Sequence, residues 1–466
     1  MAKVATPVSA RNAWAALSED EQDTFAIICK RPGVSSAALR KQLTRAISQP
    51  TLSRRLDNMA PLLRREGGGR TTVYFVRDPL IYLERAVEPG RAIGYNMAWL
   101  HDFKPNQDAF FSARLRQEMR QAGRVAGMQP SLFYQRVFER FLIDMSWASS
   151  KMEGNTYSLL DTEKLILEGL EANGKSSLEA VMILNHKSAL LHMIENLDSI
   201  SISARDIKDI HTLLSRGLLA PGEPGRLRAT LVGIGKSNYV PLAVPSQIGE
   251  QFDLLIRKAA AIADPFEQSV FLLAALPYLQ PFLDVNKRTG RISANLPLFK
   301  AGLCPLSFNQ VDARRYTSGL LLFYETQNHQ AIADAYSSGY LASAQALREH
   351  AGRLLKEPSR IDLIYRRGID MGVKEIVVRT GAGAITGPEA VIKRITRVLP
   401  AADRKPVSDQ IIEFLNHLSA DNAISFGLYP DQVERYHARK NARVAARSGA
   451  DAGAKKTRVR SRPLRP

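Results

Sequence analysis

The sequence predicts a mainly α protein that carries a smaller α+β domain at its N-terminus. Helical spacing of apolar residues dominates from about residue 106 to residue 345. The first 88 residues differ, because three short helical patterns there are followed by a β-rich run at 71–76. A chain of 466 residues is long for one hydrophobic core, so we expect two or three domains.

The N-terminal region predicts three helices after a flexible start. Residues 1–12 show no apolar period, and we expect them to be mobile. Within 13–88, Ser18 and Glu21 form a capping box at the start of the first helix. A second helix begins near Ser35, and a third begins at Ser48 or Pro50.

Three helices followed by a hairpin are typical of a winged helix-turn-helix. The glycines at 67–69 turn the chain into the β-rich run. In such modules the third helix enters the major groove of DNA. The candidate DNA-binding residues are Gln49, Thr51, Ser53, Arg54 and Arg55, with Arg70 at the wing tip. The alternative is a winged helix used for protein contact or dimerisation, so a homodimer is the competing expectation.

The remaining chain divides into a helical connector (89–140), a helical core (141–345), an appendage (356–430) and a basic tail (435–466). From Arg435 onward the sequence has eleven Lys and Arg and one acidic residue, Asp451. The tail therefore holds ten of the eighteen net positive charges. We expect this tail to be disordered and to bind nucleic acid without sequence preference. The alternative is a tail that only aids solubility.

Composition indicates a cytoplasmic protein without a membrane partner. The apolar run at 271–276 stops at Pro277, and the N-terminus lacks the apolar core of a signal peptide. Cys29 and Cys304 are isolated and fit reduced core thiols. The eight histidines are scattered, which predicts no structural zinc, and His211 is expected to be a packed residue.

Residues 284–291 place one carboxylate, one amide and three cations within eight residues, just after the apolar run. Asn286 is a suitable N-cap for the helix that follows, and Arg288 and Arg291 share a face of its first turn. A helix N-terminus with two guanidiniums suits a polyphosphate, and Asp284 could hold its Mg²⁺. The alternative is a capped helix whose basic first turn faces water.

The order of these residues resembles the signature of the Fic (Fido) family, His-Pro-Phe-x-Asp/Glu-Gly-Asn-Gly/Lys-Arg-x-x-Arg. The residues in register are Pro281, Phe282, Asp284, Asn286, Lys287, Arg288 and Arg291. The resemblance implies a helical core that binds ATP and Mg²⁺ and moves AMP onto protein hydroxyls. It also implies nucleotide binding by Asn286, Lys287, Arg288, Gly290 and Arg291, catalytic roles for Asn286 and Arg288, and Asp284 as the Mg²⁺ ligand.

Two residues depart from that signature. Gln280 stands where the family has its catalytic His, and a carboxamide cannot accept a proton as a general base does at neutral pH. Val285 stands where the family has Gly, and a β-branched residue resists a positive φ. We therefore expect weak or lost AMP transfer and a reshaped phosphate site.

Two further segments resemble Fic elements in the family's order, over roughly residues 141–342. Residues 149–155 resemble the inhibitory segment, with Ser149, Glu153 and Gly154 in register. In the family that Glu pairs with the second Arg of the signature, here Arg291. The alternative for this segment is a surface turn with one Glu.

Residues 226–241 resemble the Fic flap and predict a β-hairpin over the active site. Gly233, Ile234, Gly235 and Tyr239 supply its turn and strand character. In the family the flap holds a target protein by strand addition.

Two hypotheses follow. The first is a Fic-fold protein that binds ATP or a related nucleotide, has weak or lost AMP transfer, and is fused to a DNA-binding winged helix. The second is an active protein adenylyltransferase that Glu153 autoinhibits.

Overall fold

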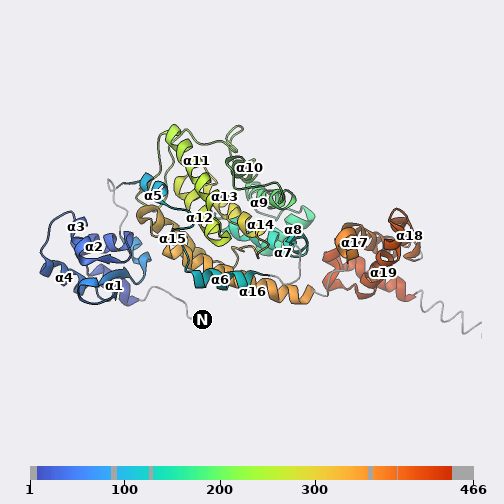
Figure 1. Ribbon diagram of the computed structural model, residues 1–466. Coiled ribbons are helices and arrows are strands. Elements are labelled where there is room, and N and C mark those ends of the chain that lie inside the picture. Colours follow the sequence, from blue (N-terminus) through green and yellow to red (C-terminus); the bar gives the residue numbers. More distant parts are fainter. Residues whose placement is uncertain (1–7, 86–91, 125–129, 355–359, 386, 443–466) are drawn as a thin grey trace, which may run out of the picture. The chain divides into compact units, whose positions relative to one another are not determined.

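The structure is a computed structural model that describes residues 8–85, 92–124, 130–354, 360–385 and 387–442 (Figure 1). The chain is mostly helical and has five short strands within these residues. It divides into two compact units, residues 1–353 and 354–466. Each unit is described by itself.

The N-terminal part of the first unit contains four helices, three strands and two short 3₁₀ turns. These elements are α1 (Val8–Ala15), α2 (Glu19–Lys30), β1 (Val34–Ser35), α3 (Ser36–Gln42), α4 (Gln49–Asn58), β2 (Leu63–Glu66), η1 (Gly69–Thr71), β3 (Val73–Val76) and η2 (Pro79–Glu84). The capping box of Ser18 and Glu21 is present, and Ser48 caps α4 as expected. Because α1 begins at Val8, the expectation of a flexible segment up to residue 12 is wrong for 8–12.

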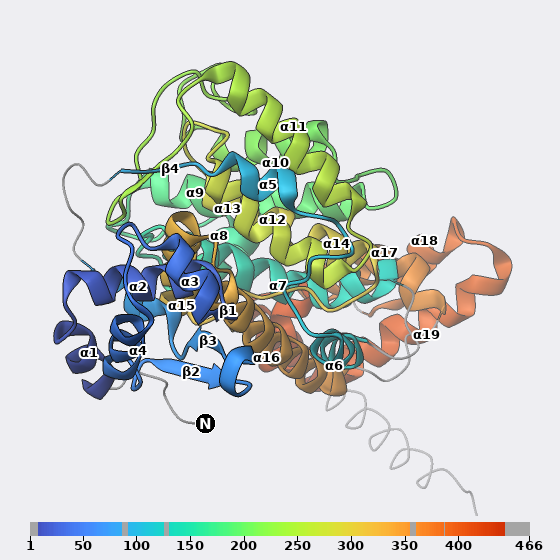
Figure 2. The same ribbon diagram turned by 60° about the vertical axis from the view of Figure 1, so that its left-hand side comes forward.

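A three-stranded antiparallel sheet completes this part, with β3 between β1 and β2 (Figure 2). The expected hairpin is present, because Leu63 pairs with Val76 and Glu66 pairs with Val73 around the glycine turn. Phe25, Leu39 and Leu52 are fully buried between the helices and this sheet. Burial of such a side chain contributes roughly 1.5–3 kcal/mol to the free energy of unfolding, relative to leaving it exposed to water.

The rest of the first unit is a helical core. Its elements are β4 (Ile93–Gly94), α5 (Met97–Asp102), α6 (Ala113–Gly123), α7 (Pro130–Lys151), α8 (Leu159–Glu168), α9 (Ser177–Glu195), α10 (Ala204–Ser215), β5 (Tyr239–Val240), α11 (Pro245–Ala261), α12 (Pro265–Leu279), α13 (Asn286–Ser293), α14 (Leu296–Lys300), α15 (Ala313–Thr326) and α16 (Gln330–Leu354). The predicted connector belongs to this core, since Leu100, Phe103 and Met119 are buried in the same apolar cluster.

Helix α12 lies in the middle of the core (Figure 1). Every residue of α12 except Gln268 is buried, because α11, α13, α14 and α15 pack around it. The helix does not stop at Pro277 as the sequence suggested, but continues to Leu279. Its C-terminal end therefore delivers the loop that starts at Gln280 to a fixed place.

Helix α15 joins the N-terminal part to the core. Leu322 is fully buried in the apolar cluster of the N-terminal part, together with Ala331 from α16. Just beyond α15, the side-chain amide of Asn328 donates to the carbonyl of Cys29 at 2.7 Å. The two parts are thus packed against each other within one unit.

The second unit has its own apolar core. Its elements are α17 (Arg360–Gly381), α18 (Glu389–Arg397), α19 (Ala401–His417), η3 (Ala420–Phe426) and a last helical stretch at 430–442. Ile369, Val373 and Ile411 are fully buried in this core. The predicted tail is wrong for 435–442, which is helical with Tyr436 buried. Residues 443–466 lie outside the described residues.

Two smaller expectations concern the thiols and the membrane. Both Cys29 and Cys304 are buried free thiols, as expected, and burial raises the pKa of each to about 12. Among the described helices, none combines the length and the apolar character needed to cross a bilayer.

Candidate functional site

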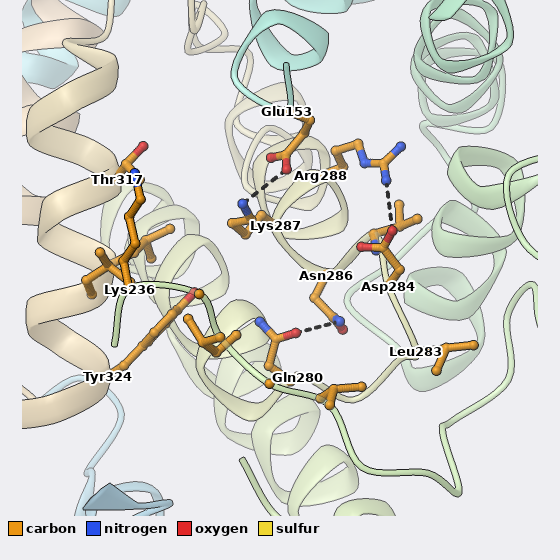
Figure 3. A pocket seen from close by; sticks show the side chains of 17 residues that line it. Glu153, Lys236, Gln280, Leu283, Asp284, Asn286, Lys287, Arg288, Thr317 and Tyr324 are labelled. Atoms are coloured by element: carbon orange, nitrogen blue, oxygen red, sulfur yellow. Dashed lines mark hydrogen bonds and ion pairs between the residues drawn. The ribbon is translucent and has the colours of Figure 1, made fainter. Parts of the chain in front are cut away.

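A cavity of about 410 Å³ opens beside the N-terminus of α13 (Figure 3). Its walls are the loop after α12, the start of α13, flap residues 232–236, Glu153 after α7, and one side of α15. This volume is within the range of small-molecule sites. The structure therefore brings the signature, the inhibitory segment and the flap to one cavity.

The loop from Gln280 to Val285 has left-handed backbone at both ends. Gln280 has φ of 51° and Val285 has φ of 65°. The expectation that Val285 resists this conformation is wrong, because its side chain is buried in the core and Asp284 accepts from its N–H at 2.6 Å. Such a conformation costs a β-branched residue about 1–3 kcal/mol, which packing and hydrogen bonds must offset. The left-handed turn therefore forms with Val at position 285.

Asn286 does not cap α13 as the sequence suggested. It is the first residue of the helix, and its side chain turns back into the loop. Its Oδ1 accepts from the N–H of Phe282, and its Nδ2 donates to the carbonyl of Phe282, each at 2.9 Å. Val285 precedes the helix and supplies no side-chain cap. The first N–H groups of α13 are therefore left for a ligand.

The cations of α13 go to different places. Arg288 lines the cavity and is 6% exposed, and Asp284 approaches one guanidinium nitrogen at 3.6 Å. The other guanidinium nitrogen, Nη1, is buried and has no hydrogen-bond partner among the described residues. An unpaired buried donor of this kind costs roughly 1–3 kcal/mol. Arg288 is thus prepared for an acceptor that the chain does not supply.

Arg291 is ion-paired with Glu153 and does not line the cavity. Gly290 also does not line the cavity, because it packs against Pro277, whose ring atoms would lie 3.1 Å from an added Cβ. The expectation that Gly290 binds phosphate is therefore replaced by a packing role. Only Asn286, Lys287 and Arg288 of the five expected nucleotide-binding residues line the cavity.

Glu153 is paired with two cations of α13. Its carboxylate lies 2.8 Å from Nη2 of Arg291. It also lies 3.0 Å from Nζ of Lys287 (Figure 3). Burial disfavours the charged carboxylate, but the charges of Arg291 and Lys287 outweigh it and lower the pKa of Glu153 to about 2. We call these three residues the Glu153 cluster. Gly154 follows Glu153 directly and turns the chain there, with φ of 93°.

A chain of hydrogen bonds joins Arg291 to Ser149 and Ser149 to His186. Arg291 donates from Nε to Oγ of Ser149 at 2.9 Å and from Nη2 to its carbonyl at 3.0 Å. The hydroxyl of Ser149 lies 2.8 Å from Nε2 of His186. Burial lowers the pKa of His186 to about 3, so its ring is neutral at physiological pH. Ser149 is therefore a hydrogen-bond partner of Arg291, in addition to Glu153.

Gln280 presents a carboxamide to the cavity, which has no basic nitrogen. Gln280 donates to the carbonyl of Pro277 at 2.7 Å, and its Oε1 accepts from Asn286 at 2.9 Å. Opposite Gln280, burial raises the pKa of the Tyr324 phenol well above its usual value. Among the described residues, no histidine lines the cavity. The carboxylates that line the cavity are Glu153 and Asp284, and each faces a cation of α13.

His211 is packed, as expected. Its ring stacks on Phe282 with centroids 3.8 Å apart, and it lies 3.2 Å from the carbonyl of Asp284 and accepts from the N–H of Gly225. Burial lowers its pKa to about 4. Across the described residues, no three His, Cys, Asp or Glu side chains gather around a common point. Asp284 would hold Mg²⁺ only together with ligand oxygens.

The flap is not the hairpin that the sequence predicted. Its only strand is β5, which pairs in parallel with β4, so that Ile93 lies opposite Tyr239. Gly233, Ile234 and Gly235 line the cavity without regular structure, whereas Tyr239 is buried against Tyr278. The pairing of β5 with β4 could not be predicted from the sequence, because the local residue pattern carries no information on a contact so distant along the chain.

Two buried charges hold the flap at its ends. Arg228 is 1% exposed and donates to the carbonyls of Gln280, Thr230 and Leu242 at 2.6–2.8 Å. At the other end Glu325 accepts from Ser237 Oγ at 2.6 Å and from the N–H of Asn238 at 3.0 Å. The flap is therefore fixed to the signature loop on one side and to α15 on the other.

Comparison with known proteins finds a family match within the residues that form this site. Residues 201–298 match the Fic/DOC family. The chain is 32% identical over 192 residues to protein adenylyltransferase Fic of Nematostella vectensis, a region that covers 40% of this chain and 44% of that protein. It is 32% identical over 161 residues to protein adenylyltransferase fic-1 of Caenorhabditis elegans, covering 33% of this chain and 31% of that protein. The chain thus spans less than half the length of these relatives.

Residues 201–298 form a Fic/DOC family domain. Among solved structures, Fic-1 (aa134–508) from C. elegans is 20% identical with a TM-score of 0.44, covering 72% of this chain and 83% of that one. A Fic domain containing signaling protein from Bacteroides thetaiotaomicron is 16% identical with a TM-score of 0.41, covering 51% and 97%.

Several residues around the Fic/DOC site carry no signal in the sequence. Thr317, Leu320 and Tyr324 of α15 form one wall of the cavity, and Arg228 and Glu325 hold the flap. Arg228 and Glu325 were missed because an isolated charge in a helical or loop pattern usually faces water. Their burial depends on elements more than 50 residues away.

The depressed pKa of Glu153 predicts how the stability of the helical core depends on pH. A folded-state pKa of about 2, below the ordinary 4.5, means that the carboxylate stabilises the fold above pH 4.5 and that this stabilisation is lost as pH falls toward 2. We expect the difference in free energy of unfolding between wild type and Glu153→Gln to be constant from pH 8 to 5 and to shrink below pH 4.5. Urea unfolding measures this difference.

Glu250→Gln, on the exposed side of α11, is the matched control and should show no such difference. A Glu153 difference that already shrinks between pH 7 and pH 5 would contradict the assignment.

The contacts of Glu325 predict a loosened flap when that carboxylate is removed. Glu325→Ala deletes the acceptor for Ser237 and Asn238, and hydrogen bonds to a charged group contribute about 1.5–3 kcal/mol. Amide hydrogen exchange of residues 229–238 should therefore rise by roughly 10-fold or more. Glu325→Gln keeps one acceptor oxygen and should change exchange less. Equal exchange in wild type and Glu325→Ala would show that the flap is held by other contacts.

Proposed function

We propose that this protein is a Fic-fold ATP-binding protein of the protein adenylyltransferase lineage with weak or lost AMP transfer. The observation that carries the proposal is Arg288, a buried guanidinium with one unpartnered nitrogen that lines a cavity at an uncapped helix N-terminus. Donors of this kind suit phosphate oxygens. The adenylyltransferase names of the relatives support ATP as the nucleotide.

Each wall of the cavity suits one part of Mg²⁺–ATP. Arg288, Lys287 and the first N–H groups of α13 would bind phosphate oxygens. Asp284, whose side chain is 70% exposed, would hold the Mg²⁺ that neutralises phosphate charge. Leu320 and Leu321 give the α15 wall an apolar surface for the base. The target hydroxyl would enter past flap residues 233–235.

The Glu153 cluster would oppose productive binding. Glu153 already holds Arg291 and Lys287, and a terminal phosphate competes for the same guanidinium and ammonium groups. We assign Ser149, Glu153 and Gly154 an inhibitory role on this basis. The competing function, an active enzyme that Glu153 autoinhibits, differs only in whether a proton acceptor exists once Glu153 is removed.

Transfer of labelled AMP tests the proposal. General acid–base catalysis is worth about 10²–10⁴-fold in rate, so wild type and Glu153→Gly should give little labelling with α-labelled ATP, Mg²⁺ and cell lysate. Gln280→His combined with Glu153→Gly should raise labelling by a factor of that order. Gln280→Asn with Glu153→Gly is the matched control and should stay silent. Strong labelling by Glu153→Gly alone would favour the active enzyme.

A second candidate function is DNA binding by residues 13–88. We propose a winged helix-turn-helix there, because the hairpin β2–β3 follows α4 and the N-terminal half of α4 is exposed at Gln49, Ser53 and Arg54. Arg55 is already paired with Asp20 and held close to α2, so it is a weaker candidate for DNA contact. Thr51 is half-buried beside Ser48, and the side chain of Arg70 lies outside the described residues.

Charge reversal at Arg54 tests this DNA contact. Removing a cation that contacts a base or a phosphate costs about 1–3 kcal/mol, so Arg54→Glu should weaken binding of the full chain to mixed-sequence duplex DNA by roughly 5-fold or more. Lys164→Glu, exposed on α8, is the control. Fluorescence anisotropy at low salt measures both. Equal affinities of the two variants would remove α4 as the DNA-reading helix.

A further inference from the structure

The corner between α18 and α19 presents charge of one sign. From Lys393 to Lys405 the chain carries five cations, Lys393, Arg394, Arg397, Arg404 and Lys405, and one carboxylate, Asp403. Asp403 is 3% exposed and accepts a hydrogen bond from the hydroxyl of Tyr365 at 2.7 Å. The single acid of this segment therefore faces the core, and the exposed side chains leave the corner positive.

Two of the five cations hold the corner together. Arg394 pairs with Glu375 of α17. Arg404 donates from Nε to the carbonyl of Leu399 at 3.0 Å and from Nη2 to the carbonyl of Arg397 at 3.3 Å. These bonds tie the start of α19 to the end of α18 across a three-residue turn at 398–400. The corner is therefore a fixed structure and not a mobile loop tip.

The other three cations are exposed and have no carboxylate partner among the described residues. Lys393 and Arg397 are one turn apart on α18, where like charges repel. Lys405 is near the positive N-terminal end of α19, where the helix dipole favours anions. Asp409, one turn further along α19, forms no ion pair with it within the described residues. A bound anion would relieve this repulsion between cations.

The tip of the corner is apolar. Val398 is 84% exposed, more than any other large apolar residue of the described chain. It lies next to Arg397 and ends α18. An apolar side chain between cations fits a DNA groove, where the thymine methyl group offers an apolar contact.

We propose that residues 389–417 form a second helix-turn-helix that binds duplex DNA. Two helices joined by a three-residue turn, with a third helix packed behind them, have the arrangement of such modules. The N-terminal half of α19, with Lys405, enters the major groove. Lys393 and Arg397 of α18 bind the phosphates beside it. This site is independent of the winged helix and of the nucleotide cavity.

The sequence beyond the corner favours a nucleic acid over an acidic protein as the partner. Residues 443–466 carry eight Lys and Arg against Asp451. The cations of residues 443–466 add to those of the corner in neutralising phosphates along one duplex, and each neutralised phosphate adds to affinity by counterion release. An acidic peptide offers neither the regular charge spacing nor a groove for Val398.

The salt dependence of DNA binding by the full chain tests the proposal. The variant Lys393→Gln/Arg397→Gln/Lys405→Gln removes the three unpartnered cations and leaves Arg394 and Arg404 in place. The slope of log K against log [KCl], measured by fluorescence anisotropy with a mixed-sequence duplex, should fall in magnitude by about 2, since Lys393 and Arg397 contact phosphates and each lost phosphate contact removes about 0.9. The control Lys164→Gln/Arg257→Gln/Arg314→Gln, with equal charge loss on α8, α11 and α15, should leave the slope unchanged.

Two further arms identify the contact. Val398→Ser keeps every charge, so it should weaken DNA binding while the slope of log K against log [KCl] stays unchanged. Circular dichroism should show wild-type helix content for all variants. Polyglutamate replaces DNA in a parallel titration. An unchanged slope in the α18–α19 variant would overturn the proposal, and so would an equal loss of binding to polyglutamate and to DNA.

Discussion

The ion pairs of Glu153 with Arg291 and Lys287 are the interaction on which the functional site depends. They join the segment after α7 to the first two turns of α13. Arg291 is 1% exposed, and a guanidinium at that depth would be strongly destabilising without a partner. Glu153 and Ser149 are those partners. The same contacts withdraw Arg291 from the cavity and leave Arg288 as its principal cation, so the stability of this region and its capacity for an anion have one origin.

Helix α15 connects the separate parts of the first unit. Three nearby positions at its C-terminal end contact different neighbours: Leu322 is buried with the N-terminal cluster, Tyr324 lines the cavity, and Glu325 holds the flap. A ligand that changes the packing of Tyr324 would act on the same helix that the N-terminal part packs against. Any coupling between nucleotide and DNA would require the two states of α15 to differ in affinity for each ligand.

The sequence predicted much of the site and little of what supports it. Glu153 and Arg291 were paired correctly, because a resemblance in residue order carries long-range information that local patterns lack. Local reasoning failed at Asn286, where loop hydrogen bonds compete with the helix cap, and at the flap, where β5 pairs with a strand some 145 residues earlier. Val285 shows the same limit, since core packing overrides the backbone preference of a β-branched residue.

The central claim is that Glu153 occupies cations that a polyphosphate would otherwise bind. Isothermal titration of Mg²⁺–ATP into the full-length wild type and into Glu153→Gly tests it most directly. If the carboxylate and the phosphate compete, the variant should bind ATP at least about 10-fold more tightly, a gain of about 1.4 kcal/mol. Equal affinity in the two proteins, or no binding in either, would contradict the account.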